Sequence, residues 1–121
     1  MEDIYNIFKS KDVFNGGYMR YLKTELAREL ASDRYIYEDD VYLSWGCLRK
    51  GKRKIKKFVS LNEGKGKGSR IFSKFLSKHK NETLWLKVKK ENINAIRFYK
   101  RFNFEQVKLD NNFVFMECIN V

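Results

Sequence analysis

The hydrophobic positions of this chain follow two different periods, and their order predicts helices alternating with strands. Tyr18, Leu22, Leu26 and Leu30 recur every four residues between charged side chains. This spacing predicts an amphipathic helix that ends near Ser32 and turns its apolar stripe to the core. A second helical pattern starts at Ser69, and a third covers residues 92–102. Their apolar faces consist of Ile71, Phe72, Phe75 and Leu76 in the former, and Ala95, Ile96, Tyr99 and Phe102 in the latter.

Shorter segments rich in β-branched and aromatic residues predict the strands. They are Arg34–Tyr37, Val41–Leu48, Ile55–Leu61, Thr83–Val88 and Phe113–Ile119. Gly51 lies in a turn between the second and third, which predicts a hairpin, and Glu38–Asp40 reads as a polar turn. The stretch Asp3–Phe8 fits either a first strand or a helical turn. This order indicates a mixed α/β sheet.

Length and composition limit the protein class. A chain of 121 residues forms one domain, and a hydrophobic share of 43% is too high for a disordered chain. No apolar run approaches the roughly 20 residues of a membrane span, and the N-terminus lacks the pattern of a signal peptide. Cys47 and Cys118 are too few for a disulfide framework, and a single histidine argues against zinc. We therefore expect a cytoplasmic, metal-free protein without membrane contact, in which Cys47 is a small core residue.

Glycines alternate with lysines in Gly64-Lys65-Gly66-Lys67-Gly68, directly before Ser69 and the second predicted helix. Glycine allows positive φ and a close approach of the backbone, and amides at a helix N-terminus bind phosphate. A P-loop would require a lysine before Ser69, and a dinucleotide-binding loop would follow the first strand. Neither fits, so the remaining interpretations are a phosphate-binding loop and a lysine-rich turn.

A second motif gives this loop a family context. Asn92, Ala95, Phe98, Tyr99 and Phe104 follow the pattern Asn-x-x-Ala-x-x-Phe-Tyr-x-x-x-Gly-Phe. Together with the loop, this helix resembles the GCN5-related N-acetyltransferases (GNAT), whose loop reads Arg/Gln-x-x-Gly-x-Gly/Ala. The resemblance covers the second half of the chain. It implies a GNAT-type mixed, mostly antiparallel sheet flanked by helices, in a single domain of residues 1–121. Residues 1–40 would be a short divergent part, and residues 41–121 the cofactor-binding core.

The resemblance also implies an activity: transfer of an acetyl group from acetyl-CoA to an amine by direct attack. In the family, the backbone of the strand before the loop polarises the carbonyl, and the loop holds the pyrophosphate. The residue matching Asn92 contacts the pantetheine arm, and the residue matching Tyr99 protonates the leaving thiolate. The implied cofactor-binding residues are Val59, Ser60, Leu61, Gly64, Lys65, Gly66, Lys67, Gly68, Ser69, Asn92 and Tyr99, and Tyr99 is the implied catalytic residue.

The chain departs from the family pattern at two positions. Glu63 stands where Arg or Gln is usual, and a carboxylate there repels a phosphate unless it turns outward. Asn103 replaces a glycine, which is tolerable because asparagine also accepts a left-handed conformation.

The pattern leaves several roles open. Tyr99 could instead be a core ring. We expect His79 to be structural, and Cys118 is not needed as a nucleophile because transfer in the family is direct. The sequence singles out no general base. The candidates are Glu38, Asp39, Asp40, Glu63 and Glu117.

A net charge of +11 exceeds what one coenzyme A requires. It favours an acidic partner, either nucleic acid or an acidic protein, unless it reflects a lysine-biased composition. Aromatic residues among basic ones could stack on bases, although in strands they more often form core and rim: Tyr35, Tyr37, Tyr42 and Trp45. The acceptor stays open, with a nucleic-acid-associated protein or a nucleobase as options. The alternative function is a catalytically weak GNAT-fold module that binds nucleic acid or an acidic protein, and both a monomer and a homodimer are compatible.

Overall fold

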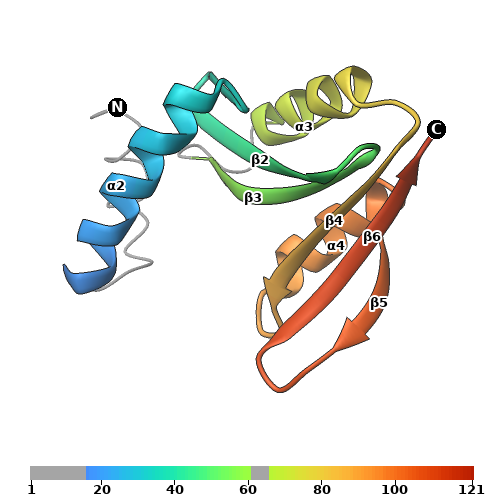
Figure 1. Cartoon of the computed structure of the whole chain (residues 1–121). Coiled ribbons are helices and arrows are strands. Elements are labelled where there is room, and N and C mark those ends of the chain that lie inside the picture. The colour runs from blue at the N-terminus through green and yellow to red at the C-terminus, as the bar shows by residue number, and fades with distance from the viewer. Residues whose placement is uncertain (1–15, 61–65) are drawn as a thin grey trace. The chain divides into compact units, whose positions relative to one another are not determined.

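A computed structural model describes residues 16–60 and 66–121 (Figure 1). Helices and strands alternate along the chain in these residues. The elements are α2 (Gly16–Ser32), β1 (Tyr35–Glu38), β2 (Val41–Arg49), β3 (Lys52–Ser60), α3 (Lys67–Lys78), β4 (Glu82–Lys89), α4 (Ile93–Arg101), β5 (Glu105–Leu109) and β6 (Phe113–Asn120). The segment Asp3–Phe8, expected to be a strand or a helical turn, lies outside the described residues.

Each helix and strand predicted between residues 16 and 121 is present, and two differences have clear causes. β3 begins at Lys52 rather than Ile55, because Lys52–Lys54 pair with Thr83–Trp85 of β4, a contact that no apolar pattern announces. β5 was not predicted. All of its residues are exposed, including Val107 and Leu109, so it lacks the alternation that marks a half-buried strand.

Hydrogen bonds join the strands in the order β1-β2-β3-β4-β6-β5. The pairings of β1 with β2, β4 with β6, and β5 with β6 are antiparallel, whereas β3 pairs with β4 in parallel. β6 runs beside β4 from Glu82↔Asn120 to Lys89↔Phe113. The sheet is therefore mixed and mostly antiparallel, as predicted.

The chain divides into two compact units. The first comprises Met1–Trp45 and Lys56–Lys78, and the second comprises Gly46–Ile55 and His79–Val121. No helix in the described part of the chain has the length and apolar character needed to cross a bilayer.

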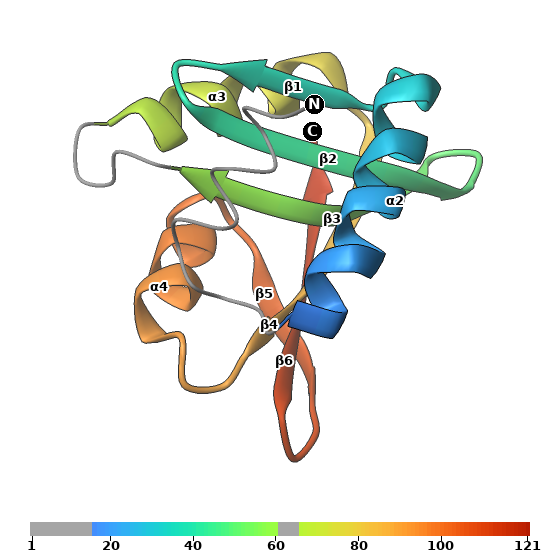
Figure 2. The same cartoon turned by 90° about the vertical axis from the view of Figure 1, so that its left-hand side faces the viewer.

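In the first unit, α2 and α3 cover opposite faces of the strands (Figure 2). Side chains alternate between the two faces of a strand, so Tyr42 and Trp45 of β2 point in opposite directions. Tyr42 is fully buried with Leu26 of α2, and Leu30, Tyr35, Tyr37 and Val59 pack against this pair. Trp45 packs on Phe75 of α3, with ring centroids 5.0 Å apart. β2 is thus buried on both faces from Val41 to Gly46.

In the second unit, α4 covers one face of the β4–β6–β5 strands (Figures 1 and 2). The residues that these strands bury are Leu84, Leu86, Val88, Val114, Met116 and Cys118. The Sγ of Cys118 lies 3.7 Å from the carbonyl oxygen of Phe102, the residue that ends α4, so the buried face is the one toward this helix. Trp85, Lys87, Phe113 and Phe115 alternate with the buried residues and face the other way.

Candidate functional site

The described part of the glycine-rich segment begins at Gly66, directly before α3. Gly66 is exposed and adopts a φ of 74°, the left-handed conformation expected of a loop glycine. Its carbonyl accepts the first helical hydrogen bond, from the Arg70 N–H at 3.1 Å. The amides of Lys67, Gly68 and Ser69 therefore open the helix without an acceptor inside it, which is the arrangement that binds anions. The predicted site residues Leu61, Gly64 and Lys65 lie outside the described residues, as does Glu63.

Gly68 does not use the positive φ that glycine allows. Gly68 lies in the first turn of α3 and is not among the positive-φ glycines. A Cβ at this position would lie 3.5 Å from the Cζ of Phe58, an ordinary contact. Phe58 of β3 packs in turn on Phe72 of α3 at a ring distance of 5.3 Å. The start of α3 is thus fixed against the strand that precedes the loop.

Val59 and Ser60 end β3. Val59 is half-buried against the cluster of Leu26 and Tyr42, so its side chain contributes to the core and only its backbone remains for a ligand. The Oγ of Ser60 is buried and has no hydrogen-bond partner among the described residues. A buried hydroxyl without a partner is uncommon, so Ser60 is a candidate for contact with a bound molecule.

Tyr99 lies on α4 and is 8% exposed. Its ring packs edge-on against Phe98 at 5.6 Å and against Phe104 at 5.9 Å. Burial raises the pKa of the Tyr99 phenol well above its ordinary value, so the hydroxyl keeps its proton throughout the physiological range. The side chain is therefore both a core ring and a protonated donor.

The raised pKa values of two tyrosines predict a loss of stability in alkali. Burial raises the pKa of Tyr99, and burial followed by the hydrogen bond to Glu29 raises that of Tyr42. The unfolded chain releases these protons near pH ~10, whereas the folded chain holds them to higher pH. Stability is thus fully present below pH ~10 and falls as the pH rises further. Guanidinium denaturation at pH 9, 10 and 11 measures this fall, and Tyr99→Phe should make it shallower. If the stability of Tyr99→Phe falls with pH as steeply as that of the unmodified protein, the raised pKa of Tyr99 would be contradicted.

Asn92 caps the N-terminus of α4. Its Oδ1 accepts a hydrogen bond from the Ala95 N–H at 3.2 Å, and its backbone is not helical. The structure thus gives Asn92 a local role in fixing the start of α4. Asn103, two residues before the start of β5, has a φ of 68°, which confirms that asparagine accepts the left-handed conformation here.

Most carboxylates proposed as general bases lie in ion pairs. Glu38 binds Lys74, and this hydrogen bond holds the pKa of Glu38 below its ordinary value, which weakens it as a base. Asp39 binds Arg70 and has a positive φ, as Asp40 does, so these two form the predicted polar turn. The Glu117 carboxylate lies 3.9 Å from the Lys52 ammonium.

One buried carboxylate, Glu29, was not predicted from the sequence. Glu29 of α2 is 5% exposed and accepts a 2.7 Å hydrogen bond from the Tyr42 hydroxyl. Its other oxygen binds the ammonium of Lys57, which also binds Glu25. The burial of Glu29 could have been predicted from the sequence. Glu29 follows Leu26 by three residues and therefore lies on the apolar face of the helix.

The cysteines and His79 do not form a reactive centre. Burial, followed by the charge of Glu105, raises the pKa of the Cys118 thiol, so it stays protonated and unreactive. The prediction that Cys47 is a core residue was wrong. Cys47 is exposed, because β2 is buried only from Val41 to Gly46 and its last three residues are exposed. The Nδ1 of His79 lies 3.5 Å from Glu82, and its carbonyl accepts from the Asn120 Nδ2 at 2.7 Å, which confirms a structural role.

The four aromatic residues considered for stacking on bases belong to the core or its edge. Tyr42 and Trp45 are buried, so they do not offer their rings to nucleic-acid bases. Tyr35 and Tyr37 are half-buried and pack on the cluster around Tyr42. Residues 16–60 and 66–121 contain no group of three or more His, Cys, Asp or Glu side chains that could hold a metal ion.

A scan against protein-family models gives no match to this sequence, and a search of curated proteins gives none either. Solved structures do match. Ard1 from Thermoplasma volcanium superposes with a TM-score of 0.79 at 22% identity, over 99% of this chain and 93% of that chain. A putative acetyltransferase of the GNAT family from Desulfovibrio desulfuricans gives a TM-score of 0.77 at 11% identity, over 98% and 91% of the two chains.

A further similar structure includes a ligand. A putative acetyltransferase from Salmonella typhimurium, solved with its cofactor acetyl-CoA, matches 68% of this chain and 58% of that chain, with a TM-score of 0.55 at 19% identity. At these identities the likeness establishes the fold. The chain has the GNAT fold, which confirms the fold predicted from the glycine loop and the α4 motif.

Proposed function

We propose that the protein is an N-acetyltransferase that moves the acetyl group of acetyl-CoA to an amine. The observation that carries this proposal is the start of α3 within a GNAT fold. The left-handed Gly66 precedes helical amides that have no acceptor inside the helix. Such a start suits the pyrophosphate of coenzyme A, because amides and helix dipole both favour an anion.

The residues at the end of β3 and the start of α3 would hold the cofactor. The amides of Lys67, Gly68 and Ser69 would bind the pyrophosphate, with the Lys67 side chain adding a positive charge. The backbone of Val59 and Ser60 would bind the acyl end of the cofactor. By the family pattern, Leu61, Gly64 and Lys65 extend this set, and Asn92 contacts the pantetheine arm.

Tyr99 would act as the proton donor. Acetyl-CoA supplies an acetyl group activated as a thioester. When an amine attacks directly, a C–N bond forms, the C–S bond breaks, the nitrogen loses a proton and the sulfur gains one. The buried Tyr99 hydroxyl is protonated at all physiological pH values and so has the proton that the leaving sulfur needs, although burial raises its pKa and makes it a weaker acid than an ordinary phenol.

The acceptor we propose is an amine on an anionic partner. The net charge of +11 favours a nucleic-acid-associated protein or a nucleobase over a basic or neutral acceptor. In this proposal, residues 1–121 act as one functional domain and residues 41–121 hold the cofactor.

Acetyl-CoA should stabilise the protein against heat. At ~100 times its dissociation constant, a ligand that binds only the folded state adds roughly 2.7 kcal/mol. Gly66→Val should abolish this shift, because a β-branched residue resists the left-handed φ that orients the following amides. Differential scanning fluorimetry with acetyl-CoA measures both effects.

Gly51→Val is the matched control. Gly51 has a φ of 79° in the β2–β3 turn, and a Cβ at either glycine would meet no atom within 4 Å. Both variants therefore carry similar backbone strain, but only Gly66→Val should lose the acetyl-CoA shift. If acetyl-CoA stabilises Gly66→Val against heat as much as it stabilises the unmodified protein, the loop is a turn that does not bind the cofactor. No shift in the unmodified protein would overturn the proposed function.

A further inference from the structure

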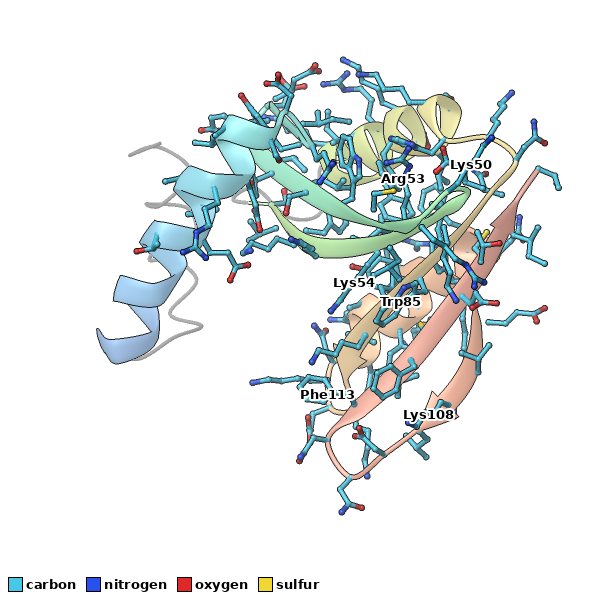
Figure 3. The ribbon with its side chains drawn as sticks, in the orientation of Figure 1. Lys50, Arg53, Lys54, Trp85, Lys108 and Phe113 are labelled. Atoms are coloured by element: carbon cyan, nitrogen blue, oxygen red, sulfur yellow. The ribbon has the colours of Figure 1, made fainter. Side chains whose placement is uncertain are left out.

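The face of β3, β4, β6 and β5 that points away from α4 in the second unit combines aromatic and basic side chains. We call it the lysine–aromatic face. Its aromatic residues are Trp85 on β4 and Phe113 and Phe115 on β6, all half-buried. Its lysines are Lys52 and Lys54 on β3, Lys87 and Lys89 on β4, and Lys108 on β5. Figure 3 shows Lys54, Trp85, Phe113 and Lys108 on these strands.

Each aromatic ring of this face carries a lysine over it. The Nζ of Lys54 lies 4.9 Å from the ring centroid of Trp85, and that of Lys87 lies 4.6 Å from Phe113. The Nζ of Lys108 lies 5.3 Å from the centroid of Phe115. These contacts confirm that the lysines and the rings share one face of the sheet. They also place a lysine ammonium over one face of each of the three half-buried rings.

The rings lie in a continuous row. Phe113 and Phe115 are two residues apart on β6, which places them roughly 6.6 Å apart along the strand. The register pairs Lys87 with Phe115, so Trp85 is the diagonal neighbour of Phe115, at roughly 7–8 Å. The order Trp85, Phe115, Phe113 is therefore a row of rings at nearly even spacing.

The charge of this face is positive. The carboxylates on the same side are Glu117, whose oxygen lies 3.9 Å from the Nζ of Lys52, and Glu105, which pairs with Glu117 in the strand register. The lysines of the face outnumber these two glutamates. A partner that covered this face would need negative charges at its edges and flat groups at its centre.

We propose that the lysine–aromatic face binds single-stranded nucleic acid. The bases would stack on Trp85, Phe115 and Phe113, and the lysines that now lie over the rings would move to the phosphates. The exchange is favourable because stacking of a base on an aromatic ring is stronger than an exposed cation–π contact. An acidic protein would bind the lysines but would leave the rings without a matching group. The residues of this face are not among the acetyl-CoA residues of the proposed function, so the nucleic-acid proposal does not rest on that function.

Fluorescence anisotropy of the full chain with labelled twelve-nucleotide oligothymidylate and oligouridylate tests the proposal, without acetyl-CoA. We expect Phe113→Ala and Phe115→Ala each to weaken binding roughly 5- to 100-fold, and Phe115→Tyr to retain it, because the ring remains. Lys87→Gln should lower the slope of log affinity against log salt by about 0.7. Lys100→Gln, on the exposed side of α4, removes the same charge elsewhere and should leave the affinity within about twofold.

Tryptophan emission gives a second readout. The chain has two tryptophans, and Trp45 is buried in the first unit, so Trp45→Phe leaves Trp85 as the only emitter. Stacking of a base should quench this emission, whereas a duplex of the same sequence, whose bases are paired, should quench it less. Binding that is equal for duplex, single strand and poly-glutamate and unaffected by loss of the rings would overturn the proposal. Absence of any binding at low salt would overturn it as well.

Discussion

Replacement of Glu29 by alanine is expected to lower the free energy of unfolding by about 3–5 kcal/mol, because it breaks a buried ion pair from one side. The carboxylate is 5% exposed and binds both the Lys57 ammonium and the Tyr42 hydroxyl. The side chain of Lys57 is only 8% exposed, so water cannot replace the lost partner. Among the described residues, Glu25, which is more exposed, would remain as the carboxylate that binds Lys57.

Urea denaturation followed by circular dichroism measures this loss, and Glu38→Ala is the matched control. Glu38 also binds a lysine, Lys74, but the side chains of that pair are each 40% exposed. Exposed ion pairs contribute little to stability, so we expect only a small change in the control. Equal effects of the two substitutions would show that the Glu29 network is hydrated in solution.

The double variant Glu29→Leu with Lys57→Met separates burial from pairing. Apolar side chains of similar volume remove both charges and leave no buried ion without a partner. Replacement of a buried pair in this way is often neutral or stabilising. We therefore expect the double variant to be more stable than Glu29→Ala. A double variant as unstable as Glu29→Ala would assign the loss to the Tyr42 hydroxyl, which also loses its acceptor.

The sequence predicted the fold well where one element buries one face. Leu26 and Leu30 predicted the buried side of α2, and the alternation around Leu84 and Leu86 predicted β4 to within a residue or two. β5 could not be predicted in this way, because it is an edge strand without a buried face. Its position depends on pairing with β6, and such long-range contacts leave no local pattern.

The candidate site was predictable to a smaller extent. The glycine spacing correctly placed a left-handed residue before α3, but it could not show that Gly68 already belongs to the helix. The helical pattern that begins at Asn92 predicted the start of α4, but the capping hydrogen bond of Asn92 was not predicted. Contacts between distant segments could not be predicted from the sequence, because they link residues that share no sequence motif. Examples are the cation–π contacts of β4 and β6 and the ion pairs of Lys57 with Glu25 and Glu29.

The Tyr99 substitution separates a proton donor from a core ring. Tyr99→Phe keeps the aromatic packing against Phe98 and Phe104 and removes only the hydroxyl. If this hydroxyl protonates the leaving sulfur, turnover should fall by about 10²-fold, near the lower end of what general acid–base catalysis contributes. This fall corresponds to roughly 2.7 kcal/mol of transition-state stabilisation. Affinity for acetyl-CoA should change little, because the effect concerns the transition state alone.

Thiol release from acetyl-CoA, measured with an amine acceptor found by screening nucleic-acid-associated proteins, acidic peptides and oligonucleotides, gives the turnover, and calorimetry gives the cofactor affinity. Tyr35→Phe is the control, since Tyr35 is a half-buried tyrosine that stacks on Tyr42 and has no part in the proposed chemistry. Full activity in Tyr99→Phe would make Tyr99 a core ring and leave water to protonate the thiolate. If Tyr99→Phe neither folds nor binds acetyl-CoA, Tyr99 would likewise be assigned to the core. Slow turnover on a folded, cofactor-binding variant is the result that the acid role requires, because only the proton would then be missing.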